Sequence, residues 1–401
     1  MTRFPNPAIR RRDLLFSAAG TLPLFAARRA TAAVSRYLVY WGTYTAGGAR
    51  YGTGESKGIY FSRLDTATGS LTPPELAVES ANPSFLAIHP RRPLLYAVNE
   101  HIDSDGKVMG EVSAFSMDRK TGKLTELNRV SSRGGMPCHL CTDKTGKVLA
   151  VANWSTGSTA SFPIKADGSL GEAATFYQHK GERAGGTPGQ PVQIHCHSVN
   201  VSADNRFLIA TDTGLNKVFV HRLDVDHATF TPHEPPFLGL KTPANPRHLV
   251  FHSNGKWAYI ANEASAGCTM LRYDPKRGVF EEGGVTRTLP PDSTARSTPA
   301  EAVVHPNGKF VYISNRGHDS IAILRIDPAD GSLTLVEAFV PGGNGPRSFN
   351  IDPTGTWLFS LMQRSNTITR LRIDKTTGKL SPTGETLPLA SPVCAMFVEA
   401  G

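Results

Sequence analysis

Short apolar runs alternate with turn-forming residues along most of the chain, and one stretch shows the pattern clearly. Residues 298–339 read TPAEAVVHPNGKFVYISNRGHDSIAILRIDPADGSLTLVEAF. After the first apolar run a turn follows at 305–308, further runs cover 310–314 and 321–326, and a turn at Gly331 leads into a fourth run. Proline and glycine set the dihedral angles of tight turns, and β-branched residues suit pleated strands. The stretch therefore predicts one antiparallel sheet of four strands.

Both turns of this unit recur along the chain. The first turn is repeated as HPRRP at 89, DKTGK at 143, SADNR at 202, HSNGK at 252, HPNGK at 305 and DPTGT at 352. The second turn recurs near residues 68, 121, 167, 227, 277, 331 and 377. A period of about 50 residues with four strands per repeat is typical of β-propeller blades.

The two ends of the chain explain why one turn is found seven times and the other six. A strand of the second type begins the repeats at 37–40, and a strand of the first type ends them at 393–398. Pairing these two completes a seventh blade and hides the free edges that an open sheet exposes. We therefore predict an all-β, seven-bladed propeller over residues 34–401, in which the last strand pairs with the first blade. The alternative, an open two-sheet sandwich, leaves both ends unpaired.

The charge of the chain changes the picture mainly at its N-terminus. The formal net charge is +9, but residues 1–33 hold six arginines against Asp13, so that roughly +4 is left for the rest. This balance is too mild to predict a nucleic-acid partner. Arginines, a short apolar run at 14–27 and small residues at 30–33 are typical of a cleaved export signal. A short membrane anchor is the alternative.

The RRDLL segment at residues 11–15 resembles a twin-arginine signal, which implies export of the folded protein by the twin-arginine machinery. We therefore expect a periplasmic or secreted protein. The apolar run is too short to span a bilayer comfortably, so no membrane insertion of the mature domain is expected. A monomer is expected as well.

The cysteines and histidines do not predict a cofactor or a metal. Five cysteines are too few and too odd in number for a disulfide framework. Cys138 and Cys141 fall in an expected strand, where residues three apart face opposite sides, so core packing is favoured over redox or zinc chemistry. His195 and His197 could share a strand face and bind zinc, but no third ligand follows at a fixed spacing.

One mouth of the expected channel collects ionisable side chains. In an antiparallel blade, the start of the innermost strand and the end of the second strand lie at the same end of the sheet. The repeated Asn99, Asn153, Asn262 and Asn315 are interpreted as loop caps that link the strands. The charged positions differ between copies while the scaffold stays alike, and this favours a functional role; they are His197, Arg247, Glu263, Arg316 and Arg347.

Four segments carry a resemblance to a known family. They read HCHSVNVSADNRFLIATD, NPRHLVFHSNGKWAYIANE, PAEAVVHPNGKFVYISNRG and GPRSFNIDPTG, beginning at residues 195, 245, 299 and 345. Together they resemble the β-propeller lactonases, which include bacterial propeller-type 6-phosphogluconolactonases and fungal carboxymuconate-lactonizing enzymes. The resemblance covers about residues 37–398.

The resemblance implies a hydrolase that opens a small lactone. The family's pattern of one histidine, two arginines and a glutamate falls on His197, Arg247, Glu263 and Arg316, which we expect to be catalytic. Either Glu263 or His197 would activate water, with arginines stabilising the oxyanion. Expected substrate-binding residues are His195, His248, Glu301, Arg347 and Gln363. The alternatives are a muconate-type lactonizing enzyme and an exported propeller that binds a ligand or protein without turnover.

Overall fold

The computed structural model describes residues 36–100 and 110–401, and the expected signal segment lies outside them. Within these ranges the regular elements are all strands. Blade 1 combines both ends of the chain and consists of β30 (Pro392–Glu399), β1 (Arg36–Thr43), β4 (Gly58–Asp65) and β5 (Glu75–Glu79). A small hairpin, β2 (Gly47–Gly48) and β3 (Gly52–Thr53), lies in the connection between β1 and β4.

The other six blades are continuous in sequence, and each is named here from its inner to its outer strand. Blade 2 is β6 (Leu86–Ile88), β7 (Leu94–Glu100), β8 (Gly110–Met117) and β9 (Leu124–Ser131); blade 3 is β10 (Pro137–Thr142), β11 (Val148–Asn153), β12 (Ser158–Pro163) and β13 (Thr175–Gln178). Blade 4 is β14 (Cys196–Val201), β15 (Phe207–Asp212), β16 (Lys217–Asp224) and β17 (Thr229–Gly239); blade 5 is β18 (Pro246–Phe251), β19 (Trp257–Asn262), β20 (Gly267–Asp274) and β21 (Val279–Arg287). Blade 6 is β22 (Thr298–Val304), β23 (Phe310–Arg316), β24 (Ser320–Ile326) and β25 (Leu333–Phe339); blade 7 is β26 (Pro346–Ile351), β27 (Trp357–Met362), β28 (Thr367–Ile373) and β29 (Leu380–Pro388).

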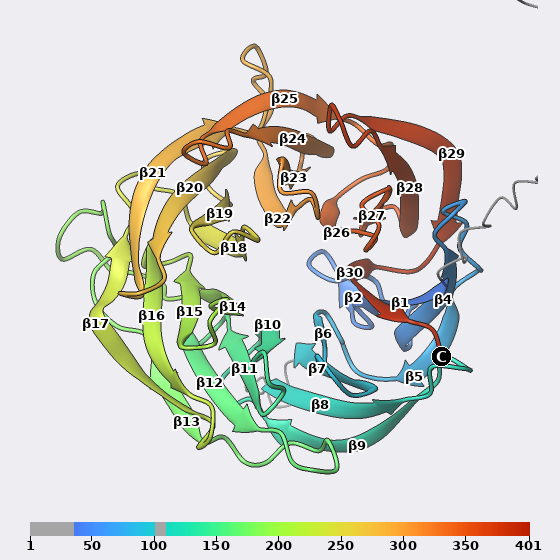
Figure 1. Cartoon of the computed structure of the whole chain (residues 1–401), viewed down its shortest axis with the longest axis horizontal. Coiled ribbons are helices and arrows are strands. Elements are labelled where there is room, and N and C mark those ends of the chain that lie inside the picture. Colours follow the sequence, from blue (N-terminus) through green and yellow to red (C-terminus); the bar gives the residue numbers. More distant parts are fainter. Residues whose placement is uncertain (1–35, 101–109) are drawn as a thin grey trace, which may run out of the picture. The chain divides into compact units, whose positions relative to one another are not determined.

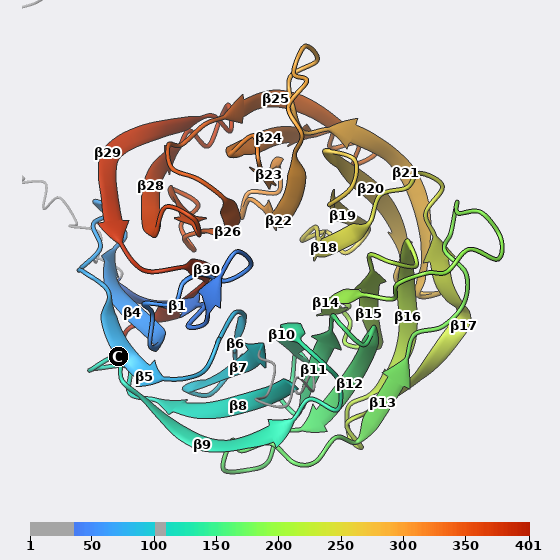
Figure 2. The same cartoon turned by 180° about the vertical axis from the view of Figure 1, so that it is seen from behind.

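The seven sheets stand around a central axis with their inner strands facing it (Figures 1 and 2). Each inner strand contacts the inner strand of the next blade, in the order β6, β10, β14, β18, β22, β26 and β30, and β30 contacts β6 again. The predicted seven-bladed propeller is therefore confirmed. Among the described residues, no helix is long and apolar enough to cross a membrane.

The ring closes through the predicted pairing of the last strand with the first. β30 runs antiparallel to β1, with Tyr37 opposite Glu399 and Trp41 opposite Ala395. The strands are buried on both faces, since Val39, Tyr40 and Trp41 are completely shielded from solvent. Burying apolar area is the main favourable term in folding, so this seam is held by packing as well as by the backbone hydrogen bonds.

Neighbouring blades are joined by a repeated contact between a tyrosine on the second strand and the outer turn of the next blade. The tyrosine hydroxyl donates to a glycine carbonyl in four such pairs: Tyr40 to Gly122, Tyr96 to Gly168, Tyr259 to Gly331 and Tyr312 to Gly378. Between blades 7 and 1 the indole of Trp357 donates to the Thr66 carbonyl instead. These contacts give the outer turn glycines a second role besides their left-handed backbone.

Two glycines of blade 7 allow this packing to be tested. Gly378 and Gly384 have φ angles of 77° and 76°, but a Cβ on Gly378 would lie 2.6 Å from the Phe310 ring of blade 6, whereas one on Gly384 meets nothing within 4 Å. Gly384→Ala should cost about 1–2 kcal/mol, since a side chain is disfavoured in the left-handed region. Gly378→Ala should cost about 1–3 kcal/mol more because the neighbouring blade is overpacked. Equal losses in denaturant unfolding would contradict this account of the blade interface.

Candidate active site

The candidate residues of the inner strands lie at irregularities where these strands begin. The pairing register shifts between Cys196 and Ser198 in β14, between Pro246 and Leu249 in β18, and between Pro346 and Ser348 in β26. The residues inside these shifts are His197, Arg247 with His248, and Arg347. A β-bulge redirects a side chain out of the regular alternation. The bulges therefore turn these side chains out of the alternating pattern that the rest of each inner strand follows.

The ends of the second strands bring the other candidates to the same place. Pro246 pairs with Asn262 and Pro299 pairs with Asn315, so the residues that follow, Glu263 and Arg316, lie at the mouth that the bulges occupy. Gln363 follows β27 in the same way, because Pro346 pairs with Met362. This confirms that the two sets of positions meet at one mouth of the channel.

A cavity of about 260 Å³ lies at this mouth. Its lining residues are Ala49, Arg50, Trp154, His197, Glu263, Arg316, Gly345, Arg347, Gln363 and Arg364. Five of the nine expected site residues line it. The other four, Arg247, His195, His248 and Glu301, do not line it.

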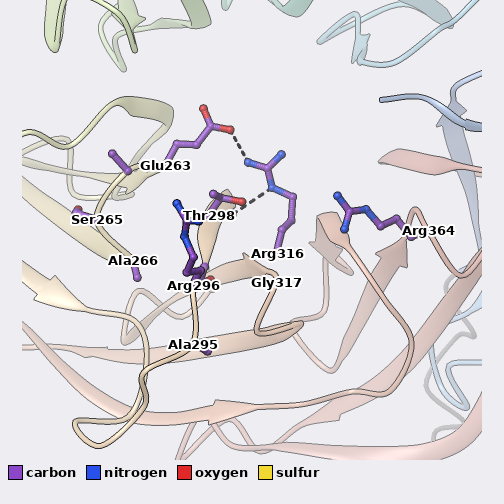
Figure 3. A pocket seen from close by; sticks show the side chains of 11 residues that line it. Glu263, Ser265, Ala266, Ala295, Arg296, Thr298, Arg316, Gly317 and Arg364 are labelled. Carbon is purple, nitrogen blue, oxygen red and sulfur yellow. Dashed lines mark hydrogen bonds and ion pairs between the residues drawn. The ribbon is translucent and has the colours of Figure 1, made fainter. Parts of the chain in front are cut away.

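Glu263 is the carboxylate of this cavity and is held by two arginines. Its Oε1 accepts a hydrogen bond from Arg316 Nη2 at 2.5 Å and lies 3.9 Å from Arg247 Nε. Burial raises the pKa of Glu263, but the attraction of Arg316 and Arg247 outweighs it and leaves the pKa below its usual value. Both arginines approach Oε1, so Oε2 remains for another partner, as Figure 3 shows for the Arg316 contact.

Arg247 is a buried cation behind Glu263. Its side chain is 3% exposed, its Nη1 donates to the Ala300 carbonyl, and its Nε makes no hydrogen bond. Burial lowers the pKa of Arg247 to about 9, and repulsion from Arg316 and Arg347 adds to the effect. This cation thus depends on Glu263 for its charge balance, since an unpaired buried charge is costly.

His197 is a neutral imidazole in the cavity wall. Burial lowers its pKa well below the usual value, and the positive charge of Arg247 lowers it further. Its Nδ1 lies 3.7 Å from the Cys138 thiol. At neutral pH the ring can therefore donate or accept a hydrogen bond without carrying charge.

Arg347 faces the cavity with its guanidinium over the Tyr44 ring, 5.3 Å from the ring centre. Among the described residues it has no hydrogen-bond acceptor or ion-pair partner for its side chain. Burial disfavours its charge, but Tyr44, Glu100 and Glu263 outweigh this and raise the pKa of Arg347. A desolvated cation aimed at a cavity is a ready partner for an anionic group.

The connection that carries β2 and β3 contributes residues that the sequence analysis did not select. Arg50 Nη2 donates to Glu100 Oε1 at 3.1 Å, and its guanidinium lies 4.6 Å from the centre of the Trp154 ring. Gln363 Nε2 donates to the Arg50 carbonyl at 2.9 Å. In the sequence, only the length of this connection, residues 44–57, could have indicated that it contributes to the site, because Arg50 lies in no repeated position.

The remaining expected substrate-binding residues do not line the cavity. His248 Nδ1 and Glu301 Oε1 are 2.8 Å apart in the channel, and Ser348 donates to the other oxygen of Glu301. His195 stacks on Trp154 at a ring separation of 4.0 Å. The His248 ring packs edge-on against the cavity residue His197, with ring centres 5.3 Å apart, so Glu301 and His248 support His197, and His195 supports Trp154.

The asparagines interpreted as scaffold residues are fully buried and make local hydrogen bonds. Asn99 Nδ2 donates to the Ala81 carbonyl, and Asn315 Nδ2 donates to the Thr288 carbonyl. Cys138 and Cys141 both lie in β10, as expected, and neither forms a disulfide. Across residues 36–100 and 110–401, no group of three His, Cys, Asp or Glu side chains could hold a metal ion.

The protein is a closed seven-bladed propeller with a charged cavity at one mouth of its channel. The family model described as "Lactonase, 7-bladed beta-propeller" matches residues 38–397. The chain therefore belongs to this lactonase family, and the expectation of a lactone-opening hydrolase is confirmed at the level of the class.

Particular relatives agree with this assignment. A 6-phosphogluconolactonase of Bacillus subtilis is 33% identical over 365 residues, covering 91% of this chain and 99% of the relative. The structure of a periplasmic gluconolactonase of Pseudomonas aeruginosa has a TM-score of 0.83 at 29% identity and covers 92% of this chain and 100% of that one. A putative 6-phosphogluconolactonase of Bacteroides fragilis has a TM-score of 0.80 at 31% identity, covering 91% and 98%. These relatives do not favour the muconate-type or non-catalytic alternatives.

The charge balance around Glu263 predicts a pH-dependent loss of stability. Glu263→Gln removes the carboxylate between Arg316 and Arg247 and should lower the free energy of unfolding by about 1.5–3 kcal/mol near pH 7. Because the folded-state pKa of Glu263 is depressed, its contribution is complete above the usual value of 4.5 and is lost as the pH falls through the folded value. The difference between the two proteins in denaturant unfolding should therefore shrink on acidification. A difference that stays constant as the pH falls from 7 to well below 4.5 would contradict this.

Proposed function

We propose that this lactonase acts on an anionic sugar lactone in the cavity at the channel mouth. One observation carries the proposal: four arginines, Arg50, Arg316, Arg347 and Arg364, line the cavity, and Glu263 is the carboxylate among its lining residues. A surplus of cations at a partly enclosed site favours a ligand with a phosphate or carboxylate group. The Bacillus subtilis relative, named a 6-phosphogluconolactonase, supports a phosphorylated substrate.

Ring opening requires a nucleophilic water and a partner for the negative charge that forms on the carbonyl oxygen. We assign the first role to Glu263, because its Oε2 is left free by the two arginines that hold Oε1. Water would lose a proton to Oε2 as its oxygen attacks the carbonyl carbon. Collapse of the tetrahedral intermediate breaks the bond to the ring oxygen, which takes up the proton and leaves as a hydroxyl group.

The positions of the arginines suggest a different electrostatic role for each. Arg316 lines the cavity beside Glu263, so it would stabilise the oxyanion. Arg347 would bind the anionic group of the substrate, and Gln363 would orient the ring. Arg247 does not line the cavity, and its proposed role is to hold Glu263 and to keep the pKa of that carboxyl low.

His197 is the second candidate for the base. Its low pKa keeps it neutral and able to accept a proton, but the pKa of Glu263 is lowered as well, so basicity does not separate the two residues. Glu263 is preferred because its Oε2 is left free by the arginines that hold Oε1. In this proposal His197 accepts a hydrogen bond from the water or donates one to the lactone carbonyl.

Substitution of Glu263 tests the assignment of the base. Glu263→Gln should lower kcat for a 6-phosphoglucono-lactone by about 10²–10⁴-fold, the usual contribution of a general base. Glu281→Gln changes an exposed glutamate of β21 and should leave the rate unchanged. Initial rates of acid release report both. If Glu263→Gln and His197→Ala each retained full activity, the assignment of the base would be abandoned.

We also propose that the protein is exported by the twin-arginine route. The RRDLL segment and the periplasmic Pseudomonas aeruginosa neighbour support this. Replacing Arg11 and Arg12 together by lysine should leave the protein in the cytoplasmic fraction of the cells that make it. Immunoblots of fractionated cells measure this, and undiminished export of the double variant would rule out the route.

A further inference from the structure

A second pocket adjoins the proposed active site and is larger than it. It measures about 620 Å³, against about 260 Å³ for the cavity at the channel mouth. The two share Glu263, Arg316 and Arg364 as lining residues, so they meet at these side chains. Ligand pockets commonly measure roughly 300–1,000 Å³, and the cavity at the mouth alone falls below that range. The space at the site is thus suited to more than one sugar ring.

The second pocket is built from three blades. Ala264, Ser265 and Ala266 follow β19 in blade 5, residues 295–298 lead into β22 in blade 6, and Arg364 follows β27 in blade 7. Figure 3 shows Arg316 between Arg296 on one side and Arg364 on the other, with Glu263 above. Apart from Thr298, the first residue of β22, these residues lie outside the repeated strands, so the strand pairing does not account for their side chains.

The charges of this pocket favour an anion. Arg296, Arg316 and Arg364 line it, and Glu263, already paired with Arg316, is the acidic residue among its lining side chains. Within the described part of the chain, the side chains of Arg296 and Arg364 have no hydrogen bond or ion pair. Two guanidinium groups that no carboxylate neutralises can bind a phosphate or a carboxylate through charge-assisted hydrogen bonds.

Hydroxyl groups complete the lining. Ser265, Ser297 and Thr298 line the pocket. Because hydroxyls both donate and accept, they match the hydroxyl groups of a sugar.

We propose that this pocket is a second subsite, which binds a negatively charged sugar unit attached to the lactone ring. The substrate class is then the lactone of an acidic disaccharide. Its lactone ring would lie at Glu263, and the phosphate or carboxylate of its distal sugar would lie at Arg296 and Arg364. This inference rests on the proposed function, because the reacting lactone must lie in the cavity at the mouth. Phosphate and carboxylate share the chemistry that the arginines recognise.

Four lactones distinguish the effect of a second sugar ring from the effect of a negative charge on that ring. Glucono-δ-lactone has one neutral ring, and cellobiono-δ-lactone adds a second neutral ring. The other two carry a carboxylate or a phosphate at the distal C6 of cellobiono-δ-lactone. We expect kcat/KM for at least one charged two-ring lactone to exceed that for the neutral two-ring lactone by about tenfold, the effect of one charge-assisted hydrogen bond.

Arg296→Gln is the variant that tests the pocket. It should reduce the ratio of kcat/KM between the charged and the neutral two-ring lactones by about tenfold. Arg277→Gln serves as the matched control, because Arg277 lies in the outer turn between β20 and β21, at the other end of blade 5, and should leave the ratio unchanged. Thermal unfolding of both variants confirms that they are folded.

The outcomes are distinct. A preference for either charged lactone that Arg296→Gln abolishes supports the subsite, and the preferred lactone identifies phosphate or carboxylate. No preference for charge, or a preference that survives Arg296→Gln, overturns it. If a 6-phosphoglucono-lactone were opened but none of the four lactones were, the subsite would be overturned while the proposed function stood. If neither it nor any of the four were opened above the spontaneous rate, the proposed function would fail.

Discussion

The antiparallel pairing of β30 with β1 is the contact on which the rest of the structure depends. Without it β1 would have a free edge, and the inner wall would be open between β26 and β6. The contacts from β6 through β30 and back to β6 form a closed circle, so the bulges at the start of the inner strands all face one channel. Because the ring is closed, residues from blades 4, 5, 6 and 7 can line a single cavity although more than 150 residues separate His197 from Gln363.

The second constraint is the charge at the mouth. Arg247 is buried and Arg316 and Arg347 lie close enough to lower its pKa, so this cluster is unfavourable without a carboxylate. Glu263 provides it, at the cost of a strong ion pair that depresses the carboxyl's own pKa. Arg347 and Arg364 line the cavity without an ion-pair partner among the described residues, and a negatively charged substrate would complete the balance.

The propeller could be predicted from the sequence because it follows from a repeated local signal. Turns such as HPNGK and DGSL recur at a nearly constant spacing, and the unmatched strands at the two ends leave one natural way to close the ring. The mouth positions could also be predicted, since antiparallel pairing places Pro246 opposite Asn262 and thereby brings Arg247 near Glu263.

Finer placement could not be predicted, because it depends on the bulges and on an irregular connection. A two-residue bulge at Arg247 and His248 places the former behind Glu263 and the latter against Glu301, and no spacing in the sequence shows this. Arg50 comes from the connection between β1 and β4, where no repeat aligns it with the other blades. His195 stacks on Trp154, a contact between two blades that depends on side-chain conformation.

The most direct test of this account is a crystal structure with a lactam of 6-phosphogluconate, in which an N–H group replaces the ring oxygen and prevents hydrolysis. The account predicts the lactam in the cavity lined by His197, Glu263 and Arg347, with its carbonyl oxygen on Arg316, its carbonyl carbon facing Glu263 Oε2 and its phosphate on an arginine. Binding at the opposite mouth of the channel, or in this cavity with the carbonyl group turned away from Glu263 and Arg316, would contradict it.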